Sequence, residues 1–480
     1  MCRIDDRVVA LSQIEGDAHG YTSQDPSLTL PEFTRAPAST TALGALRKLF
    51  QIWNLDEGRR GQSNWNPLGE FIRQGSRVAI KPNWVYHTPR EPATLDSLIT
   101  HTSVIQAVVE YVALAKPDSV IVGDAPLQGC DFDALRDAAG LDSLESRARD
   151  LGLALEIHDF RRTINVSGRA AGERHEKVRS IDRFVEFDLG NDSCLQPLDA
   201  DADRFRVTVY NPDLLKATHR PGSHKYLIAR ELLEADVVVN MPKLKCHMKS
   251  CITGSLKNLV GINGHKEYLP HHRKGGSNNG GDCYPGAPTW KRVAEDVADF
   301  VNRDQGFRPL RYGLGRAAAV GRKLAALAGA DDNIEGAWYG NDTIWRTCID
   351  LNRILMYGGT DGRLHLDHQR KIVSITDAII AGEGEGPLRP TPIHSGFLTG
   401  ATNPAAAEYV HSRLMGFDPN LIPLVHGAFE SGPWPLVDFP PTEIRVLSNG
   451  GETQGAQVLP IRHFVPPSGW LGHCELQKSE

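Results

Sequence analysis

The residues best suited to chemistry are concentrated between Met241 and Lys274. This segment contains seven Lys or Arg residues, four histidines and a single acid, Glu267, although the chain of 480 residues has a formal net charge of -6. A basic segment in an acidic protein favours a small anionic ligand, because a nucleic-acid surface would make the overall charge positive. We therefore expect a small anionic molecule as partner, and no nucleic acid.

Hydroxyl, amide and ammonium groups in and around this segment could bind carboxylate or phosphate oxygens. The stretch Thr253-Gly-Ser-Leu-Lys-Asn258 combines a hydroxyl side chain, backbone N–H groups at an expected helix start and the ammonium group of Lys257. It is not a P-loop, because GxxxxGK[ST] is absent, and an ordinary capped helix with surface lysines could have the same residues. The predicted contacts to a substrate or cofactor are Lys81, Asn83, Lys243, Lys245, Thr253, Asn258 and Asp377.

Three residues are candidates for catalysis, namely His247, Lys257 and Asp124. His247 lies two positions after Lys245, and neighbouring cations would lower its pKa and keep it neutral, the form that accepts a proton as a base. Asp124 directly follows an expected strand, where its carboxylate could take part in proton transfer. Strands also end in polar loops for ordinary reasons, so each of these positions has that alternative.

A divalent metal is the alternative ligand of the same segment. His265, His271 and Asp282 could bind one, although their spacing matches no zinc signature and lacks the arrangement of HExxH. The eight cysteines include no CxxC, which argues against a disulfide scaffold and against a self-contained iron–sulfur motif. Cys246 and Cys251 lie inside the basic segment and could be core thiols, redox-sensitive thiols or metal ligands.

Short apolar strands precede the polar residues named above. We expect strands at Arg77–Lys81, Ser119–Gly123, Asp236–Asn240 and Lys371–Ile375, alternating with helices. This pattern predicts an α/β fold with a mostly parallel sheet and helices on both faces. Ligands bind at the carboxyl ends of the strands in such sheets, so we expect the polar residues to meet at that edge.

The pattern along the chain predicts one main domain with additions. Residues 1–75 are expected to form an N-terminal arm and helix, and residues 76–425 a single α/β domain. A largely helical insertion is expected at about 265–370, with helices at 290–301, 314–327 and 342–357. Residues 426–480 read as a proline-containing extension.

The composition is that of a globular protein. Hydrophobic residues make up 40% and charged residues 23%, and no apolar run reaches the roughly 18 residues that span a bilayer. The first residues contain no long apolar stretch of a secretory signal. We therefore expect a cytoplasmic protein without a membrane partner, and make no prediction of its oligomeric state.

Four motifs resemble those of a known family. They are Lys81-Pro-Asn83, Gly123-Asp124, Pro242-Lys-Leu-Lys-Cys-His247 and Thr253-Gly-Ser-Leu-Lys-Asn-Leu-Val-Gly261, followed downstream by Asp377 with Gly382–Pro387 and by the stretch Asn403–Met415. In this order they resemble the domain of unknown function 362 family over about residues 76–425. The resemblance implies a related fold and a shared site, but no agreed reaction.

Two departures from that family concern possible ligands. The chain has Asn403-Pro404 and Glu408 where the family often has an Asp-Pro…Asp pattern, and it lacks the ferredoxin-like cysteine clusters of some members. A second resemblance is to the nickel-pincer lactate racemases, which hold a nucleotide-derived cofactor. That resemblance implies Lys257 as the anchoring lysine and His247 or His265 as proton shuttles.

Together these patterns predict an enzyme, although the reaction class is not fixed by them. Its substrate or cofactor would carry a carboxylate or phosphate and bind at the carboxyl edge of the sheet, with proton-transfer chemistry of the isomerase or racemase type. A metal-dependent or iron–sulfur-linked redox protein and a non-catalytic anion-sensing module remain as alternatives.

Overall fold

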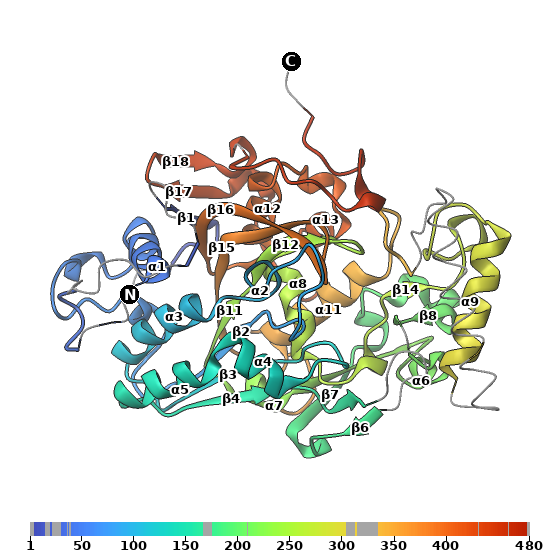
Figure 1. The fold of residues 1–480 in the computed structure, drawn as a ribbon, viewed down its shortest axis with the longest axis horizontal. Helices are drawn as coiled ribbons and strands as arrows, with labels where there is room; N and C mark the ends of the chain where they lie inside the picture. Colours follow the sequence, from blue (N-terminus) through green and yellow to red (C-terminus); the bar gives the residue numbers. More distant parts are fainter. Residues whose placement is uncertain are drawn as a thin grey trace.

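One large mixed sheet organises the fold in this computed structural model (Figure 1). The structure describes residues 4–14, 20–21, 30–35, 37, 40–166, 175–208, 210–303, 313, 335–430, 432–458 and 460–477. Within them the sheet has eleven strands, ordered β18-β17-β1-β16-β15-β11-β2-β3-β4, with β12 pairing β13 and β15. The strands are β1 (Val8–Gln13), β2 (Arg77–Pro82), β3 (Ser119–Asp124), β4 (Leu155–Asp159), β11 (Val237–Met241), β12 (Lys243–His247), β13 (Cys251–Thr253), β15 (Lys371–Glu385), β16 (Arg389–Ala401), β17 (Arg445–Ser448) and β18 (Gly451–Gln454).

The centre of the sheet is parallel. Strand β11 pairs in parallel with β15 on one side and with β2 on the other, and β2, β3 and β4 continue in parallel. Antiparallel pairing appears where β16 joins β15 and β1. The predicted α/β class with a mostly parallel sheet is confirmed.

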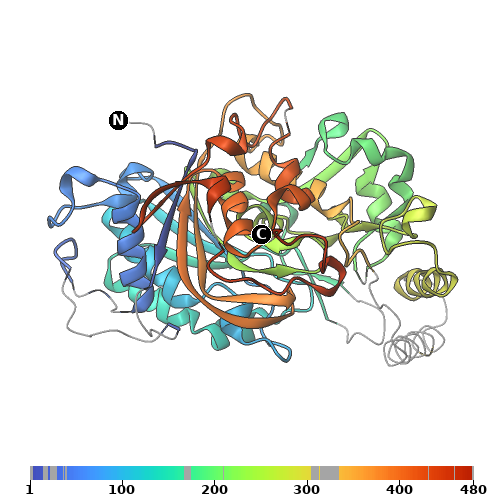
Figure 2. The same ribbon diagram turned by 90° about the horizontal axis from the view of Figure 1, so that it is seen from above.

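Helices cover both faces of the sheet (Figures 1 and 2). Successive residues of β11 divide between two apolar cores: Val238 packs with the core that includes α11 and α12, whereas Val237 and Val239 pack with the core that includes α1 and α3. Strand side chains alternate between faces, so short all-apolar strands bury both sides. The helices are α1 (Thr41–Ile52), α2 (Leu95–Leu98), α3 (Thr102–Leu114), α4 (Phe132–Ala139), α5 (Leu141–Asp150), α6 (Pro212–Thr218), α7 (Arg230–Glu234), α8 (Ser255–Asn258), α9 (Thr289–Asn302), α11 (Ile344–Tyr357), α12 (Pro404–Leu414) and α13 (Pro423–Gly427).

Small sheets surround the main one. Strands β7, β10 and β9 form one sheet, and β14 with β8 and β5 with β6 form two-stranded sheets. Their bounds are β5 (Thr163–Asn165), β6 (His175–Lys177), β7 (Phe184–Asp188), β8 (Phe205–Arg206), β9 (His219–Arg220), β10 (Ser223–Ala229) and β14 (His272–Arg273). In the predicted insertion, α9 and α11 are present, and the helix predicted at 314–327 lies outside the described residues.

The structure contains local elements that the sequence pattern did not predict. The segment after Met241 forms the β12–β13 hairpin, and the Gly-Glu-rich stretch after Asp377 continues β15. Residues 226–229 belong to strand β10, which α7 follows directly. The expected N-terminal arm includes β1, which is buried between β16 and β17. Long-range pairing overrode local composition in each case.

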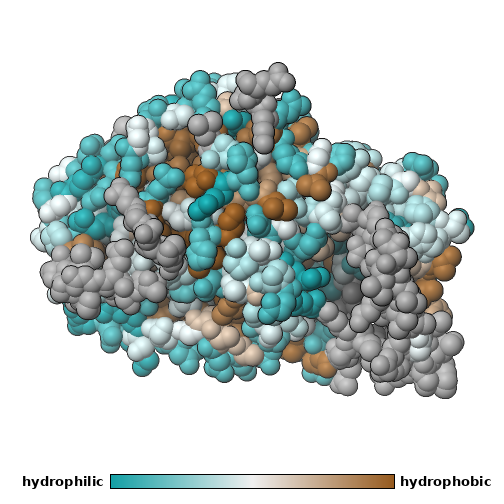
Figure 3. All heavy atoms as spheres, turned by 45° about the horizontal axis from the view of Figure 1, so that its top comes forward, coloured by the Kyte–Doolittle hydropathy of each residue, from teal (hydrophilic) through white to brown (hydrophobic). Residues whose placement is uncertain are grey.

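The surface is mixed in polarity. Figure 3 shows hydrophilic and apolar side chains interspersed over one face of the molecule. Among the described helices, none combines the length and apolar character that a membrane span needs.

Candidate functional site

Strand β12 sorts the basic segment into two faces. Leu244 and Cys246 point into the apolar core, so Lys243, Lys245 and His247 occupy the opposite face. The sequence Lys-Leu-Lys-Cys-His is thus an alternating strand pattern whose polar face lies at the carboxyl edge of the sheet. This edge is where the sequence predicted that the polar residues would meet.

Lys243 is used within the protein. Its Nζ lies 2.6 Å from Asp377 Oδ2, and it donates to Tyr21 Oη at 2.7 Å and to the Ile380 carbonyl at 3.0 Å. Neither Lys243 nor Asp377 lines the central cavity described below. Contact of these two residues with a ligand stays a prediction, which must compete with their neutralisation of each other across the β12–β15 pairing.

A second buried ion pair joins β2 and β3. Lys81 Nζ lies 2.7 Å from Asp124 Oδ1 and donates to Asn258 Oδ1 at 3.0 Å. Asp124 also accepts from the backbone N–H of Trp84 at 2.6 Å. Lys81 and Asp124 border the cavity, but their charges already have partners. A catalytic role for Asp124 stays a prediction that must compete with this structural role.

The central cavity opens at the carboxyl edge of the sheet and has a volume of about 830 Å³. Nine of the residues that the sequence singled out border it: Lys81, Asn83, Asp124, Lys245, His247, Thr253, Lys257, Asn258 and His271. Asn83 and Asn258 are engaged with protein groups. Asn83 accepts from Lys245 Nζ at 2.8 Å, and Asn258 Nδ2 donates to Asn240 Oδ1 at 2.8 Å.

Lys257 differs from the other cavity lysines. The residue is 8% exposed, and its ammonium group has no hydrogen bond or ion pair with any described residue. Burial lowers the pKa of Lys257, while the nearby Cys348 and Glu408 act in the opposite direction. Thr253 beside it has a buried hydroxyl without a hydrogen-bond partner in the described part of the chain. These two groups are free to bind a ligand.

Lys245 is buried without a carboxylate partner. It donates to Asn83 Oδ1 and to the Leu98 carbonyl, both neutral groups. Burial, reinforced by the charge of Lys243, holds the pKa of Lys245 well below its usual value. An anion bound nearby would favour the charged form of Lys245.

The two cavity histidines are held in opposite tautomers. His247 Nδ1 lies 3.1 Å from the Lys249 backbone N–H, which can only donate, so the proton of a neutral His247 is on Nε2. His271 Nδ1 lies 2.7 Å from the Leu269 carbonyl, which can only accept, so its proton is on Nδ1 and Nε2 carries the lone pair. Burial keeps the pKa of both imidazoles well below 6.5, with nearby lysines acting in the same direction.

This geometry reverses one interpretation. His247 was expected to be a base, but its neutral form presents an N–H donor. A base role for His247 stays a prediction that this tautomer does not favour, whereas His271 Nε2 is an acceptor nitrogen without a hydrogen-bond partner among the described residues. The sequence suggested His271 only as a metal ligand, and no local signal could reveal the carbonyl that fixes its ring.

The predicted metal set does not assemble. His265 pairs with Glu267 at 3.0 Å, and Asp282 accepts from the Thr343 hydroxyl at 2.6 Å and from backbone N–H groups. Neither borders the cavity that His271 lines. Within the described residues no group of three His, Cys, Asp or Glu side chains could hold a metal ion. The described structure therefore does not support this metal site.

A side chain of the protein itself occupies the anion site that was expected at the start of the helix at Ser255. Helix α8 has one turn, and a Cβ added at Gly254 would lie 2.0 Å from Glu408 Oε2. The buried carboxylate of Glu408 therefore sits at the helix start, where it is favoured by the helix dipole. Of the Thr253–Asn258 stretch, Thr253 and Lys257 remain available to a ligand.

Gly261 makes the Lys81–Asp124 pair possible, which yields a prediction. A Cβ at this position would lie 1.9 Å from Asp124 Oδ1 and 2.6 Å from Lys81 Nζ. Gly261→Ala should lower the free energy of unfolding by about 1–3 kcal/mol, as overpacking does, measured by urea denaturation. The control is Gly58→Ala, where a Cβ meets nothing within 4 Å. Equal stability of the two variants would contradict this reading.

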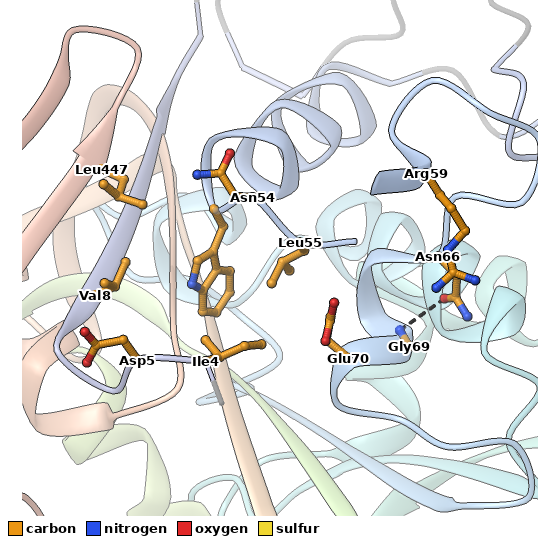
Figure 4. A pocket seen from close by; sticks show the side chains of 11 residues that line it. Ile4, Asp5, Val8, Asn54, Leu55, Arg59, Asn66, Gly69, Glu70 and Leu447 are labelled. Atoms are coloured by element: carbon orange, nitrogen blue, oxygen red, sulfur yellow. Dashed lines mark hydrogen bonds between the residues drawn. The ribbon is translucent and has the colours of Figure 1, made fainter. Parts of the chain in front are cut away.

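A second cavity, of about 400 Å³, lies near β1 and α1 (Figure 4). Of its charged residues, Asp5 pairs with Arg445 and Arg59 with Asp56. Its described lining contains no lysine or histidine. It therefore lacks the unpaired ammonium and the histidine pair that distinguish the central cavity.

Comparison with known proteins agrees with the motifs. Residues 187–413 match the family model described as "Domain of unknown function (DUF362)". This segment of the chain is similar to that family. The matched residues contain β12, α8 and both cavity histidines. The motifs on β2 and β3, which also carry the resemblance, lie outside the matched range.

Two further likenesses are more distant than the DUF362 match. A thylakoid-associated protein of Synechocystis sp. is 26% identical over 249 residues, which are 51% of this chain and 57% of that relative. A solved structure from Thermotoga maritima aligns over 81% of this chain and 59% of that one, with 12% identity and a TM-score of 0.30. A TM-score this low does not bear on the fold.

Proposed function

We propose that the protein is an enzyme that binds a small organic anion, bearing a carboxylate or phosphate, and moves a proton on it. The observation that carries the proposal is the buried ammonium of Lys257, which borders the central cavity without a partner among the described residues. A buried cation without a counter-charge in direct contact is costly, and Glu408, which favours the charged form of Lys257 from nearby, forms no ion pair with it among the described contacts. A bound anion would supply that charge, assisted by Lys245 and the hydroxyl of Thr253.

The histidine pair supports proton transfer of the isomerase or racemase type. Such reactions need a proton acceptor and a proton donor at one substrate, and His271 and His247 offer these roles from one cavity. Their pKa values lie well below 6.5, so both are neutral at physiological pH. The likeness to nickel-pincer racemases stays a prediction: Lys257 and His247 border the cavity, but His265 does not.

An anion-sensing module remains the second candidate, because the same cavity could bind without turnover. The redox alternative has less support, since Cys246 and Cys251 are buried outside the cavity lining. We also propose a cytoplasmic location, which fits seven described cysteines that are all free.

Anion binding should depend on pH through Lys257. Binding needs the protonated ammonium, and burial lowers its pKa below the usual 10.5. Affinity for sulfate and benzoate, which keep their charge, should therefore be full at neutral pH and decline as pH rises through that lowered pKa. Calorimetric titration at several pH values measures this.

Two variants assign the effect to this residue. Lys257→Met should weaken binding about ten- to hundredfold, since hydrogen bonds to charged groups contribute about 1.5–3 kcal/mol. Lys257→Arg should bind with an affinity that declines less with pH than that of the unaltered protein, because a guanidinium stays charged while Lys245 still titrates. Unchanged affinity in Lys257→Met would remove the basis of the proposal.

A further inference from the structure

Helix α9 presents an apolar face to the central cavity. Ala294, Val297, Ala298 and Val301 follow the i, i+3, i+4, i+7 spacing of one helix face, and all four border the cavity. They are half-buried, and none belongs to either of the two large apolar cores. This face is therefore apolar surface that belongs to neither of the two described cores.

Polar contacts fix the orientation of α9. Asp299 accepts from Arg206 at 3.0 Å and, with Asp296, from Lys274 at 2.8 and 2.6 Å. Glu295 accepts from the Tyr284 hydroxyl at 2.8 Å. These contacts hold the acidic side of the helix against its neighbours, so the apolar face is held toward the cavity.

Other elements extend the apolar wall. Leu127, which is 42% exposed, also borders the cavity. Figures 1 and 2 both place α9 well away from α8, so the cavity reaches from the cationic floor to this helix. The remaining apolar lining includes Val207, Met248, Val260, Leu269 and Leu388.

The size of the cavity exceeds the needs of a very small acid. Its volume of about 830 Å³ falls within the roughly 300–1,000 Å³ typical of sites for drug-sized ligands. A three-carbon acid held by Lys257 would leave the α9 face in contact with water. Apolar surface of this extent is stabilised when a ligand covers it.

We propose that the ligand is an amphiphilic organic anion, with its charged head at Lys257 and its apolar body against the Ala294–Val301 face of α9. This inference rests on the proposed anion binding and adds a class of substrate to it. Either an alkyl chain or an aromatic ring system could pack against this face.

Carboxylates with one head group and bodies of increasing size test the inference. Binding of acetate, hexanoate, decanoate and 2-naphthoate is measured by calorimetry at concentrations below micelle formation. Each buried methylene should tighten binding about fourfold, and naphthoate should bind more tightly than acetate. Decanol, which lacks the charge, should bind more weakly than decanoate, and Lys257→Met should abolish that difference.

Matched variants locate the body of the ligand. Val297→Ser should weaken decanoate binding and leave acetate unchanged, whereas Val293→Ser, on the same helix but outside the lining, should alter neither. Ala298→Trp should fill the space next to the apolar face of α9, and should therefore exclude decanoate but not acetate. Thermal unfolding verifies that each variant is folded.

The outcomes separate the two proposals. If acetate and decanoate bind equally well, the amphiphile is excluded while anion binding stands. If decanol binds as tightly as decanoate, or Val293→Ser acts like Val297→Ser, the assigned orientation is wrong. If no carboxylate binds at all, the proposed function fails and this inference with it.

Discussion

The substitution His271→Gln is expected to lower the rate of hydrogen exchange between substrate and solvent by about 10²–10⁴-fold, the usual contribution of a general acid or base. The Leu269 carbonyl at 2.7 Å holds the proton on Nδ1 and leaves Nε2 as the acceptor in the cavity. Glutamine has a similar polarity but cannot take up the proton. Binding of the anion should change little, since Lys257 is intact.

The exchange can be measured before the product is known. The protein is incubated in deuterated water with a panel of hydroxy, oxo and amino acids and phosphate esters, and deuterium uptake is read by mass spectrometry. The rate should stay constant from neutral pH to below 6.5 and fall only at the lowered pKa of His271, because the acceptor is the neutral form. No uptake across the panel despite binding would favour the sensing module.

Two control variants sharpen this test. His272→Gln changes an adjacent buried histidine that does not border the cavity, and it should exchange at the unaltered rate. His247→Gln keeps an N–H donor, so it should lower the exchange rate less than His271→Gln does. A larger loss at His247 would mean that the donor and acceptor roles are reversed.

The substitution Asp377→Ala should lower the free energy of unfolding by about 3–5 kcal/mol, the cost of leaving a buried charge unpaired. Lys243 and Asp377 have fully buried side chains, and their charged atoms lie 2.6 Å apart. Tyr21 adds a hydrogen bond of 2.6 Å to the same carboxylate. Urea denaturation measures the change.

The double variant Lys243→Met/Asp377→Leu should recover most of this loss, because replacing both partners of a buried pair with apolar residues is often neutral. Glu443→Ala is the matched surface control. It breaks the exposed pair with Arg7 and should cost no more than about 1 kcal/mol. Equal losses for Asp377→Ala and Glu443→Ala would show that the buried pair contributes no more to the free energy of unfolding than the exposed pair.

The sequence was sufficient for the centre of the fold. Short apolar runs ending in Lys81, Asp124 and Asn240 predicted parallel strands, because only strands buried on both faces have such runs. The cap of α1 was also predictable, since Thr40 accepts from the Leu43 N–H at 3.1 Å. Local chemistry determines these features.

Pairing between distant strands could not be predicted. Lys243 and Lys257 look alike in sequence, yet one meets Asp377 on β15 and the other faces the cavity. The difference depends on which strand lies next to β12. Composition also misled at β12, where three basic residues suggested a loop although every second side chain enters the core.

The order of strands has a consequence for synthesis of the chain. Within the described residues, strand β1 pairs with β16 and β17, which lie far later in the chain (Figure 1). At translation rates of about 5–20 residues per second, roughly 20–80 s pass between the synthesis of β1 and the synthesis of these partners. Its apolar residues and both of its hydrogen-bonding edges are unsatisfied until then. The sheet therefore cannot be completed until β16 and β17 have been synthesised, and until then β1 offers free edges with which another strand could pair.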